Sequence, residues 1–360
     1  MRRATSFAFL ITLLLVSPSL ILGGKDAAPP PGETQANEQL RKVLEREYDL
    51  VPKFIKGQKR YYRLWMTIEN LDTYGKLAGR SQWRGDLERV VTSVDPSGRA
   101  EEKITWKNVG FRAWLMGKEQ YGPHQPVPWA DGFSYRFSLE DRYEDLKWDF
   151  SQIPKNMLGF VFVAAFQISA HVEIDFLRSR RHAAIQRLHH VGELQENLPE
   201  EGQTFSLDFP PLFTNSKLQR QHVQVGFLGL TLAEGEPCAL IDYRQGPQPF
   251  TWTMTMGPPM QPEPAAMNTA LTSRQAGIFV VRLKDGSLVH GQFTEIAMSK
   301  VIPTAGGDSA LSLTQGTWHI REIRDEDFER GLAGWEEEQT PTPRFRPEVH
   351  ASNPTVYEKK

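Results

Sequence analysis

The sequence predicts an α+β fold: a large, mainly antiparallel β-sheet, open or curled into a half barrel, with a central helical segment and a short N-terminal helix. Three observations support this class. Apolar and polar residues alternate with period two both before and after the middle of the chain. The middle, residues 154–201, combines a mostly apolar stretch with a basic stretch that contains alanines, and its length favours helix. Residues 37–48 place apolar side chains at helical spacing.

The composition excludes several classes of protein. The 360 residues include 42 Lys and Arg against 44 Asp and Glu, for a formal net charge of -2. Nucleic-acid-binding proteins normally carry a basic excess, so no nucleic acid is expected as a partner. The single cysteine, Cys238, excludes an internal disulfide and a cysteine-based zinc site. Its apolar neighbours predict a buried, inert thiol.

Residues 1–24 are predicted to be a signal peptide. Arg2 and Arg3 precede the apolar run Phe7–Val16, which has the order of a secretory signal. The run is short for a membrane-spanning helix, which needs roughly 20 residues. Retention of this segment as an anchor is the alternative, and an uncleaved N-terminus would then be the only membrane contact. Residues 25–36 follow as a Pro-rich linker.

Residues 37–153 are predicted to form an N-terminal β-rich region. In Arg60–Asn70 the residues Tyr62, Leu64, Met66 and Ile68 alternate with more polar ones, as in a half-buried strand. Further strands are expected at Gln82–Val94, Arg99–Val109 and Phe133–Phe137. Asp95-Pro96-Ser97-Gly98 suits a type I turn and predicts a hairpin between the first two of these.

Residues 202–332 are predicted to form a C-terminal β-rich region, which either completes the same sheet or forms a second subdomain. Asp285-Gly286 suits a hairpin with a type I′ turn. Met256–Gln275 contains four prolines and is predicted to be a loop, and residues 333–360 a disordered tail. The expected strands are Gln203–Phe209, Gln221–Ala233, Pro237–Tyr243, Phe250–Met256, Ile278–Lys284, Leu288–Met298 and Thr317–Ile323.

His171, Glu173 and Asp175 form the densest group of potential ligands. If residues 167–176 are a strand, the three share one face, with neighbours about 7 Å apart. An imidazole and two carboxylates can then bind a divalent metal or provide a general base. If the segment is helical, His171 and Asp175 lie one turn apart and Glu173 points elsewhere. The simpler interpretation is the polar face of an amphipathic element.

Trp65, Trp83, Trp106 and Trp114 all fall in the first β-rich region. A large sheet can bury them in its core. Alternatively, they line an apolar pocket or a stacking surface, because tryptophan also serves interfaces.

These patterns predict an exported envelope protein, periplasmic or secreted. The leading hypothesis is a non-enzymatic protein that binds a lipid or other apolar or amphipathic ligand, or an envelope protein partner, in a sheet-lined cleft. The alternatives are a metal-assisted hydrolase using His171, Glu173 and Asp175, and a structural assembly component. No cofactor is identified by the sequence.

Overall fold

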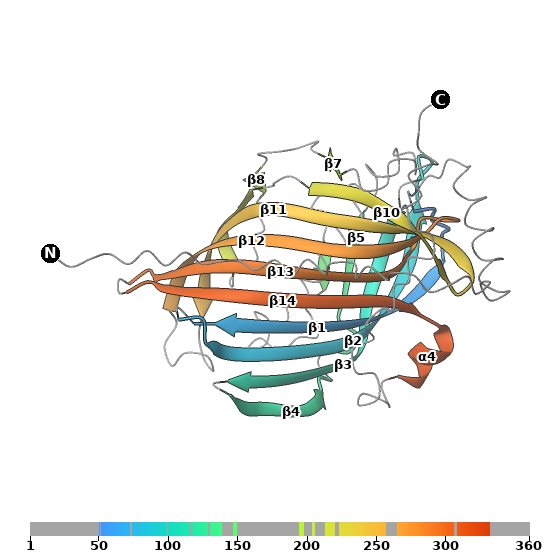
Figure 1. The fold of residues 1–360 in the computed structure, drawn as a ribbon. Helices are drawn as coiled ribbons and strands as arrows, with labels where there is room; N and C mark the ends of the chain where they lie inside the picture. The colour runs from blue at the N-terminus through green and yellow to red at the C-terminus, as the bar shows by residue number, and fades with distance from the viewer. Residues whose placement is uncertain are drawn as a thin grey trace, which may run out of the picture.

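A computed structural model describes residues 50, 52–72, 74–98, 100–115, 117–128, 130–138, 147–149, 194–197, 204–205, 213–219, 223–256, 265–305 and 308–331. These residues form one 14-stranded sheet, in which neighbouring strands pair antiparallel, and one short helix (Figure 1). The first strands are β1 (Lys59–Leu71), β2 (Leu77–Val94), β3 (Ala100–Leu115), β4 (Lys118–Pro126), β5 (Ser134–Ser138) and β6 (Lys147–Asp149). Three short strands follow: β7 (Leu194–Asn197), β8 (Thr204–Phe205) and β9 (Phe213–Gln219). The last elements are β10 (Val223–Ala233), β11 (Glu236–Met256), β12 (Ala265–Arg282), β13 (Leu288–Pro303), β14 (Ala310–Ile323) and the helix α4 (Asp325–Arg330).

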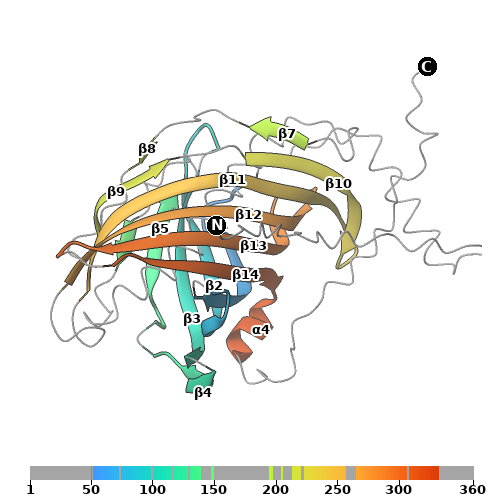
Figure 2. The same ribbon diagram turned by 60° about the vertical axis from the view of Figure 1, so that its left-hand side comes forward.

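The N-terminal and C-terminal strands belong to the same sheet because β1 pairs with β14. The strand order is β6-β5-β3-β2-β1-β14-β13-β12-β11-β10-β7, with β4 beside β3 and β9 beside β11. Both views show the sheet curling, so that β3 and β5 lie across from β11 and β12 (Figures 1 and 2). One buried apolar cluster includes residues from both sides of this curl, among them Tyr135 on β5 and Tyr243 on β11. We call the face that carries this cluster the inner face and the opposite one the outer face.

Period-two alternation explains which side chains reach the inner face. On β1, Tyr62, Leu64 and Met66 are buried in the cluster, as their spacing predicted. On β11 to β14, Tyr243, Phe279, Phe293 and Trp318 form a row of aromatic contacts across four strands. Their consecutive ring centroids are 5.8, 6.3 and 4.8 Å apart. The aromatic row therefore unites the C-terminal half of the core.

Three glycines make room for this row. Gly277 and Gly291 are the cross-strand partners of Phe293 and Phe279, and Gly316 lies under the Trp318 ring. A Cβ added at Gly316 would lie 1.9 Å from the Trp318 ring. Glycine has no side chain to shield its own backbone, so the aromatic rings that pack on these glycines shield it instead.

The turns that join the strands agree only in part with the sequence-based expectation. The Asp95–Gly98 turn forms, and Gly98 N–H donates to the Asp95 carbonyl at 2.9 Å. The hairpin around Asp285-Gly286 also forms, but it is not type I′, because only Gly286 of the two has a positive φ, 67°. Glu234 and Gly235, at φ 50° and 80°, supply that pattern instead, between β10 and β11.

The predicted α+β class is wrong. Apart from the six residues of α4, the regular structure of the described chain is β-strand, and no helix in that part is long and apolar enough to cross a membrane. Of the predicted central helical segment, 154–201, the described portion Leu194–Asn197 is strand β7, paired with β10. Backbone pairing with a neighbouring strand there overrides local helix propensity. The remainder of that segment and the predicted helix at 37–48 lie outside the described residues.

The interval Met256–Gln275 is not all loop, because β12 begins at Ala265. Its inner positions include Thr269, Ser273 and Gln275, which are polar and buried. A strand with polar residues on its inner face lacks the alternation by which strands are recognised in a sequence.

Candidate functional site

The residues before β1 cross the end of the curled sheet that carries α4, which we call the helix end. Lys53 N–H donates to the Asp285 carbonyl in the β12–β13 turn at 2.8 Å. Gly57 N–H donates to the Val91 carbonyl on β2, and Val91 N–H donates to the Gln58 carbonyl. Residues 52–58 therefore tie the C-terminal part of the sheet to its N-terminal part.

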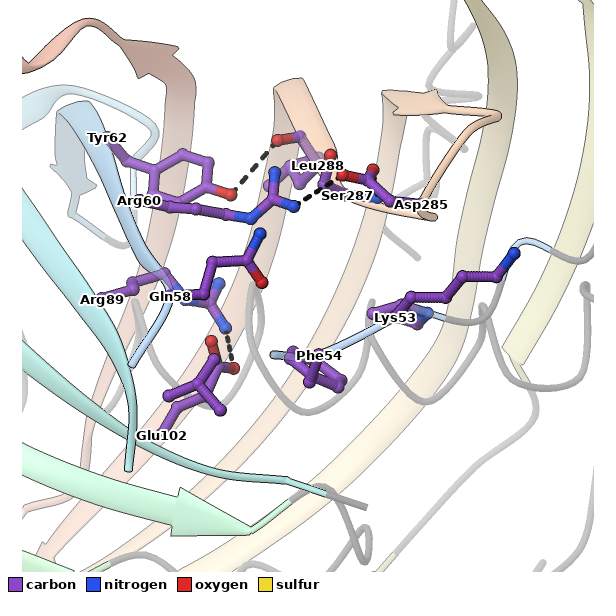
Figure 3. Close-up of a pocket in the computed structure, with 12 residues that line it drawn as sticks. Lys53, Phe54, Gln58, Arg60, Tyr62, Arg89, Glu102, Asp285, Ser287 and Leu288 are labelled. Carbon is purple, nitrogen blue, oxygen red and sulfur yellow. Dashed lines mark hydrogen bonds and ion pairs between the residues drawn. The ribbon is translucent and has the colours of Figure 1, made fainter. Parts of the chain in front are cut away.

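A small pocket lies beneath this crossing segment (Figure 3). Phe54, Tyr62, Arg89, Glu102 and Leu288 contribute to its wall, and its free volume is about 20 Å³. That is room for about one water molecule and not for an organic ligand. The pocket is a polar gap in the core rather than a substrate site.

Several polar groups of the pocket bond to one another or to the backbone. The Tyr62 hydroxyl donates to the Leu288 carbonyl at 3.2 Å, and Arg89 Nη2 donates to Glu102 Oε2 at 2.6 Å (Figure 3). The Arg89 guanidinium also lies 5.6 Å from the centroid of the Tyr62 ring. Burial raises the pKa of Tyr62 to about 12, so its hydroxyl remains a hydrogen-bond donor at neutral pH.

A chain of ion pairs continues from the pocket to the surface. Arg60 contacts Asp285 at 2.7 Å and Glu322 at 3.3 Å, and Arg282 contacts Glu322 at 2.7 Å and also Glu236. Burial alone would raise the pKa of Asp285, but hydrogen bonds from Ser287 and Arg60 lower it to about 2. Each of these guanidinium groups already has a carboxylate partner, so the chain clamps the helix end together and offers no vacant cation for an anionic ligand.

The outer face carries a second clamp where α4 docks. Arg63 Nε donates to Asp86 Oδ1 at 2.7 Å, and its Nη2 donates to the carbonyls of Asp327 and Gly331. Asn108 Nδ2 donates to Asp86 Oδ2 at 3.0 Å. These bonds hold the end of α4 against β1 and β2.

The predicted ligand group His171, Glu173 and Asp175 lies outside the described residues. Within the described ranges, no group of three or more His, Cys, Asp or Glu side chains is arranged to hold a metal ion. Cys238 is fully buried, which confirms the predicted burial of the thiol, and this burial raises the pKa of the thiol to about 11.

The four tryptophans divide between the two faces. Trp83 and Trp106 are buried in the core, against Phe111 and Phe133 respectively. Trp65 and Trp114 lie on the outer face, each between two arginines. Arg84 and Arg321 lie 5.5 and 5.4 Å from the Trp65 ring, and Arg112 and Arg80 lie 4.3 and 5.9 Å from the Trp114 ring. The four do not converge on one pocket.

A band of apolar side chains crosses the outer face at the opposite end of the sheet. The β1–β2 and β13–β14 turns lie at this end (Figure 1). We call this the hairpin end. Met298, Leu313, Leu71 and Leu77 are consecutive cross-strand partners on β13, β14, β1 and β2. Met298 is 60% exposed and Leu77 43% exposed. The outer-face band consists of these four residues together with Ile296, Ile302 and Leu311, which are also exposed.

The band arises because two strands reverse their polarity along their length. On β14, Trp318 and Ile320 fill the inner face near the helix end, whereas nearer the hairpin end Ser312 and Thr314 take the inner positions and Leu311 and Leu313 the outer ones. On β13, the inner Phe293 is followed by inner Glu295 and outer Ile296 and Met298. The register between the two strands is continuous across this reversal, so no bulge produces it. The sequence pattern contains this reversal, but the sequence-based prediction did not include the band.

Comparisons with known proteins do not assign a family. No family model and no curated protein matches the chain. One solved structure that matches is a candidate lipoprotein from Parabacteroides distasonis ATCC 8503, at 10% identity, 75% coverage of this chain, 97% of that chain and a TM-score of 0.18. A DUF1329 family protein from Desulfovibrio piger ATCC 29098 matches at 12% identity, 82% and 93% coverage and a TM-score of 0.16. A mutant porin of Rh. blastica matches at 6% identity, 74% and 100% coverage and a TM-score of 0.17. These TM-scores are too low to support a common fold or function.

Proposed function

We propose that this chain is a non-enzymatic, exported envelope protein that binds an apolar or amphipathic partner through the outer-face band. The observation that carries the proposal is the continuity of the band: its central row runs through four neighbouring strands, in unbroken register from β13 through β14 to β1 and across a register shift from β1 to β2. Contiguous apolar patches on soluble proteins commonly mark interaction sites. Export is supported by Arg2, Arg3 and the apolar run Phe7–Val16.

Energetics favours binding over a purely structural reason for the band. An aliphatic or methionine side chain contributes about 1.5–3 kcal/mol when it is fully buried, and Met298, Ile296 and Leu311 forgo about half of that burial. Replacing these outer residues with polar ones would lower the free energy of unfolding only slightly. A partner that covers the band would bury the apolar surface that stays exposed to water in the isolated chain.

A photo-crosslinking experiment in the host's own cells tests this function. A benzophenone amino acid placed at position 298 should give a light-dependent adduct with a lipid or a protein, because the side chain lies within the proposed contact. The same residue at position 228 is the control, since Leu228 is 38% exposed but lies on β10 outside the band. Absence of an adduct at 298, or equal adducts at both positions, would contradict the proposal.

A further inference from the structure

The charged residues that border the outer-face band are predominantly basic. Arg274 lies on β12 opposite Ile296, Lys300 lies on β13 opposite Leu311, and Lys76 precedes Leu77. Within the described residues none of these three has an ion-pair partner. Of the acids nearby, Glu69 pairs with Arg80, and Asp72 accepts the backbone N–H groups of Tyr74 and Lys76. Asp308, in the β13–β14 turn, is exposed, so the unpaired cations Lys76, Arg274 and Lys300 outnumber the acids Asp72 and Asp308. This border is positive although the chain as a whole carries a net charge of -2.

Aromatic side chains lie at the same end of the sheet. Tyr74, in the β1–β2 turn, is 86% exposed. Trp114 lies two strands from β1 on the outer face, beside Arg80. Tyrosine and tryptophan combine an apolar ring with a polar group, and this combination suits the boundary between lipid and water.

The composition of this surface distinguishes a membrane from a protein partner. Protein interfaces are enriched in aromatic residues and arginine and depleted of lysine, and a tightly bound partner requires anchors that fit pockets. Here the row is aliphatic, two of the three bordering cations without ion pairs are lysines, and the pocket beneath residues 52–58 lies at the other end of the sheet. Lysines beside exposed aliphatic side chains match an anionic bilayer, which attracts basic groups and accepts apolar groups at any lateral position.

We propose that the outer-face band docks on the surface of a lipid bilayer that contains anionic phospholipids. The inference rests on the proposed function and names the partner. Ile296, Met298 and Leu311 enter the boundary between headgroups and acyl chains, while Lys76, Arg274 and Lys300 contact the headgroup phosphates. The polar inner positions on β13 and β14 at this end, such as Glu295 and Ser312, stay on the face turned away from the lipid.

Vesicle sedimentation tests the proposal with the exported protein purified from its host. Wild type should bind vesicles of phosphatidylglycerol and phosphatidylcholine in equal parts about tenfold or more tightly than vesicles of phosphatidylcholine alone, and added salt should weaken this binding. The double variant Met298→Ser, Leu311→Ser and the triple variant Lys76→Gln, Arg274→Gln, Lys300→Gln should each lose about tenfold or more. All variants keep the same N-terminus, so any vesicle binding by that segment is the same in every protein and does not affect the comparison.

A matched control replaces two lysines and one arginine at the helix end: Lys56→Gln, Lys284→Gln, Arg324→Gln. All three side chains are exposed and remote from the band, so this variant should bind like wild type. Failure of wild type to bind the anionic vesicles, or equal binding by the band variants, would overturn the membrane proposal. If the residue at 298 nevertheless crosslinks to a protein in cells, the proposed binding function stands and only the lipid partner is wrong.

Discussion

At the scale of single residues, burial keeps the two histidines on β13 and β14, His290 and His319, neutral on the outer face. Burial lowers the pKa of His319, and burial together with the charges of His319 and Arg321 lowers the pKa of His290 to about 4. Both residues lie near the helix end, where His290 faces Arg321 across the β13–β14 ladder. They are therefore uncharged at neutral pH and do not add to the basic border of the band.

The depressed pKa of His290 predicts a loss of stability in mild acid. Between the unfolded value of 6.5 and the folded value of about 4, the unfolded chain binds a proton that the folded chain does not. The free energy of unfolding should therefore fall by about 2 kcal/mol between pH 7 and pH 5 from this residue. Denaturant titrations of wild type and His290→Gln at both pH values measure the effect. Equal pH dependence in the two proteins would show that His290 is not responsible, and measurements at pH 7 and 8 provide the baseline.

At the scale of the strands, the glycines under the aromatic row make a second prediction. A Cβ at Gly277 would lie 2.4 Å from Phe293 Cβ and 2.5 Å from the Gln292 carbonyl oxygen, so the backbone itself would have to move. Gly277→Ala should lower the free energy of unfolding by about 1–3 kcal/mol, as overpacked cores do. Gly79→Ala on β2 is the control, because its nearest contact would be an ordinary 3.4 Å. Thermal melts that show the same change for both variants would contradict the account of the row.

The strands that could be predicted from the sequence are those whose inner face is mainly apolar. Arg60–Asn70 is an example, because Tyr62, Leu64 and Met66 all enter the core. The first half of β12 was not predictable in this way, since its buried inner residues include Thr269 and Gln275. The α+β class was wrong because composition does not show which segments form backbone hydrogen bonds with a neighbouring strand. Leu194–Asn197 is such a segment, since it pairs with β10.

The candidate site was predictable only in its residue types. Tryptophan suggested interfaces, but alternation places Trp83 in the core and leaves Trp114 outside. The outer-face band was missed because apolar positions on a strand are normally taken to face the core. The reversal of polarity between Phe293 and Met298 was the available signal, and it becomes interpretable only when the register shows that no bulge intervenes.

At the scale of the whole molecule, the two ends of one sheet differ in character. The helix end is closed by residues 52–58 and by ion pairs such as Arg60–Asp285, and its apolar residues face inward. The hairpin end turns its apolar residues outward and carries the basic border. Because β1 pairs with β14, the band combines residues from the two sequence-distant halves of the chain, and a stable sheet holds them in one surface.

The most direct test of the account is the environment of residue 298 when the protein meets membranes. Met298→Cys can be labelled selectively with an environment-sensitive fluorophore, because the native thiol of Cys238 is buried. On mixing with membranes isolated from the host's envelope, the label at 298 should shift to the blue and brighten. A label at Lys284→Cys, at the helix end, should not change. A label at 298 that remains in a water-like environment, or equal shifts at 298 and 284, would contradict the claim that the outer-face band is the binding surface.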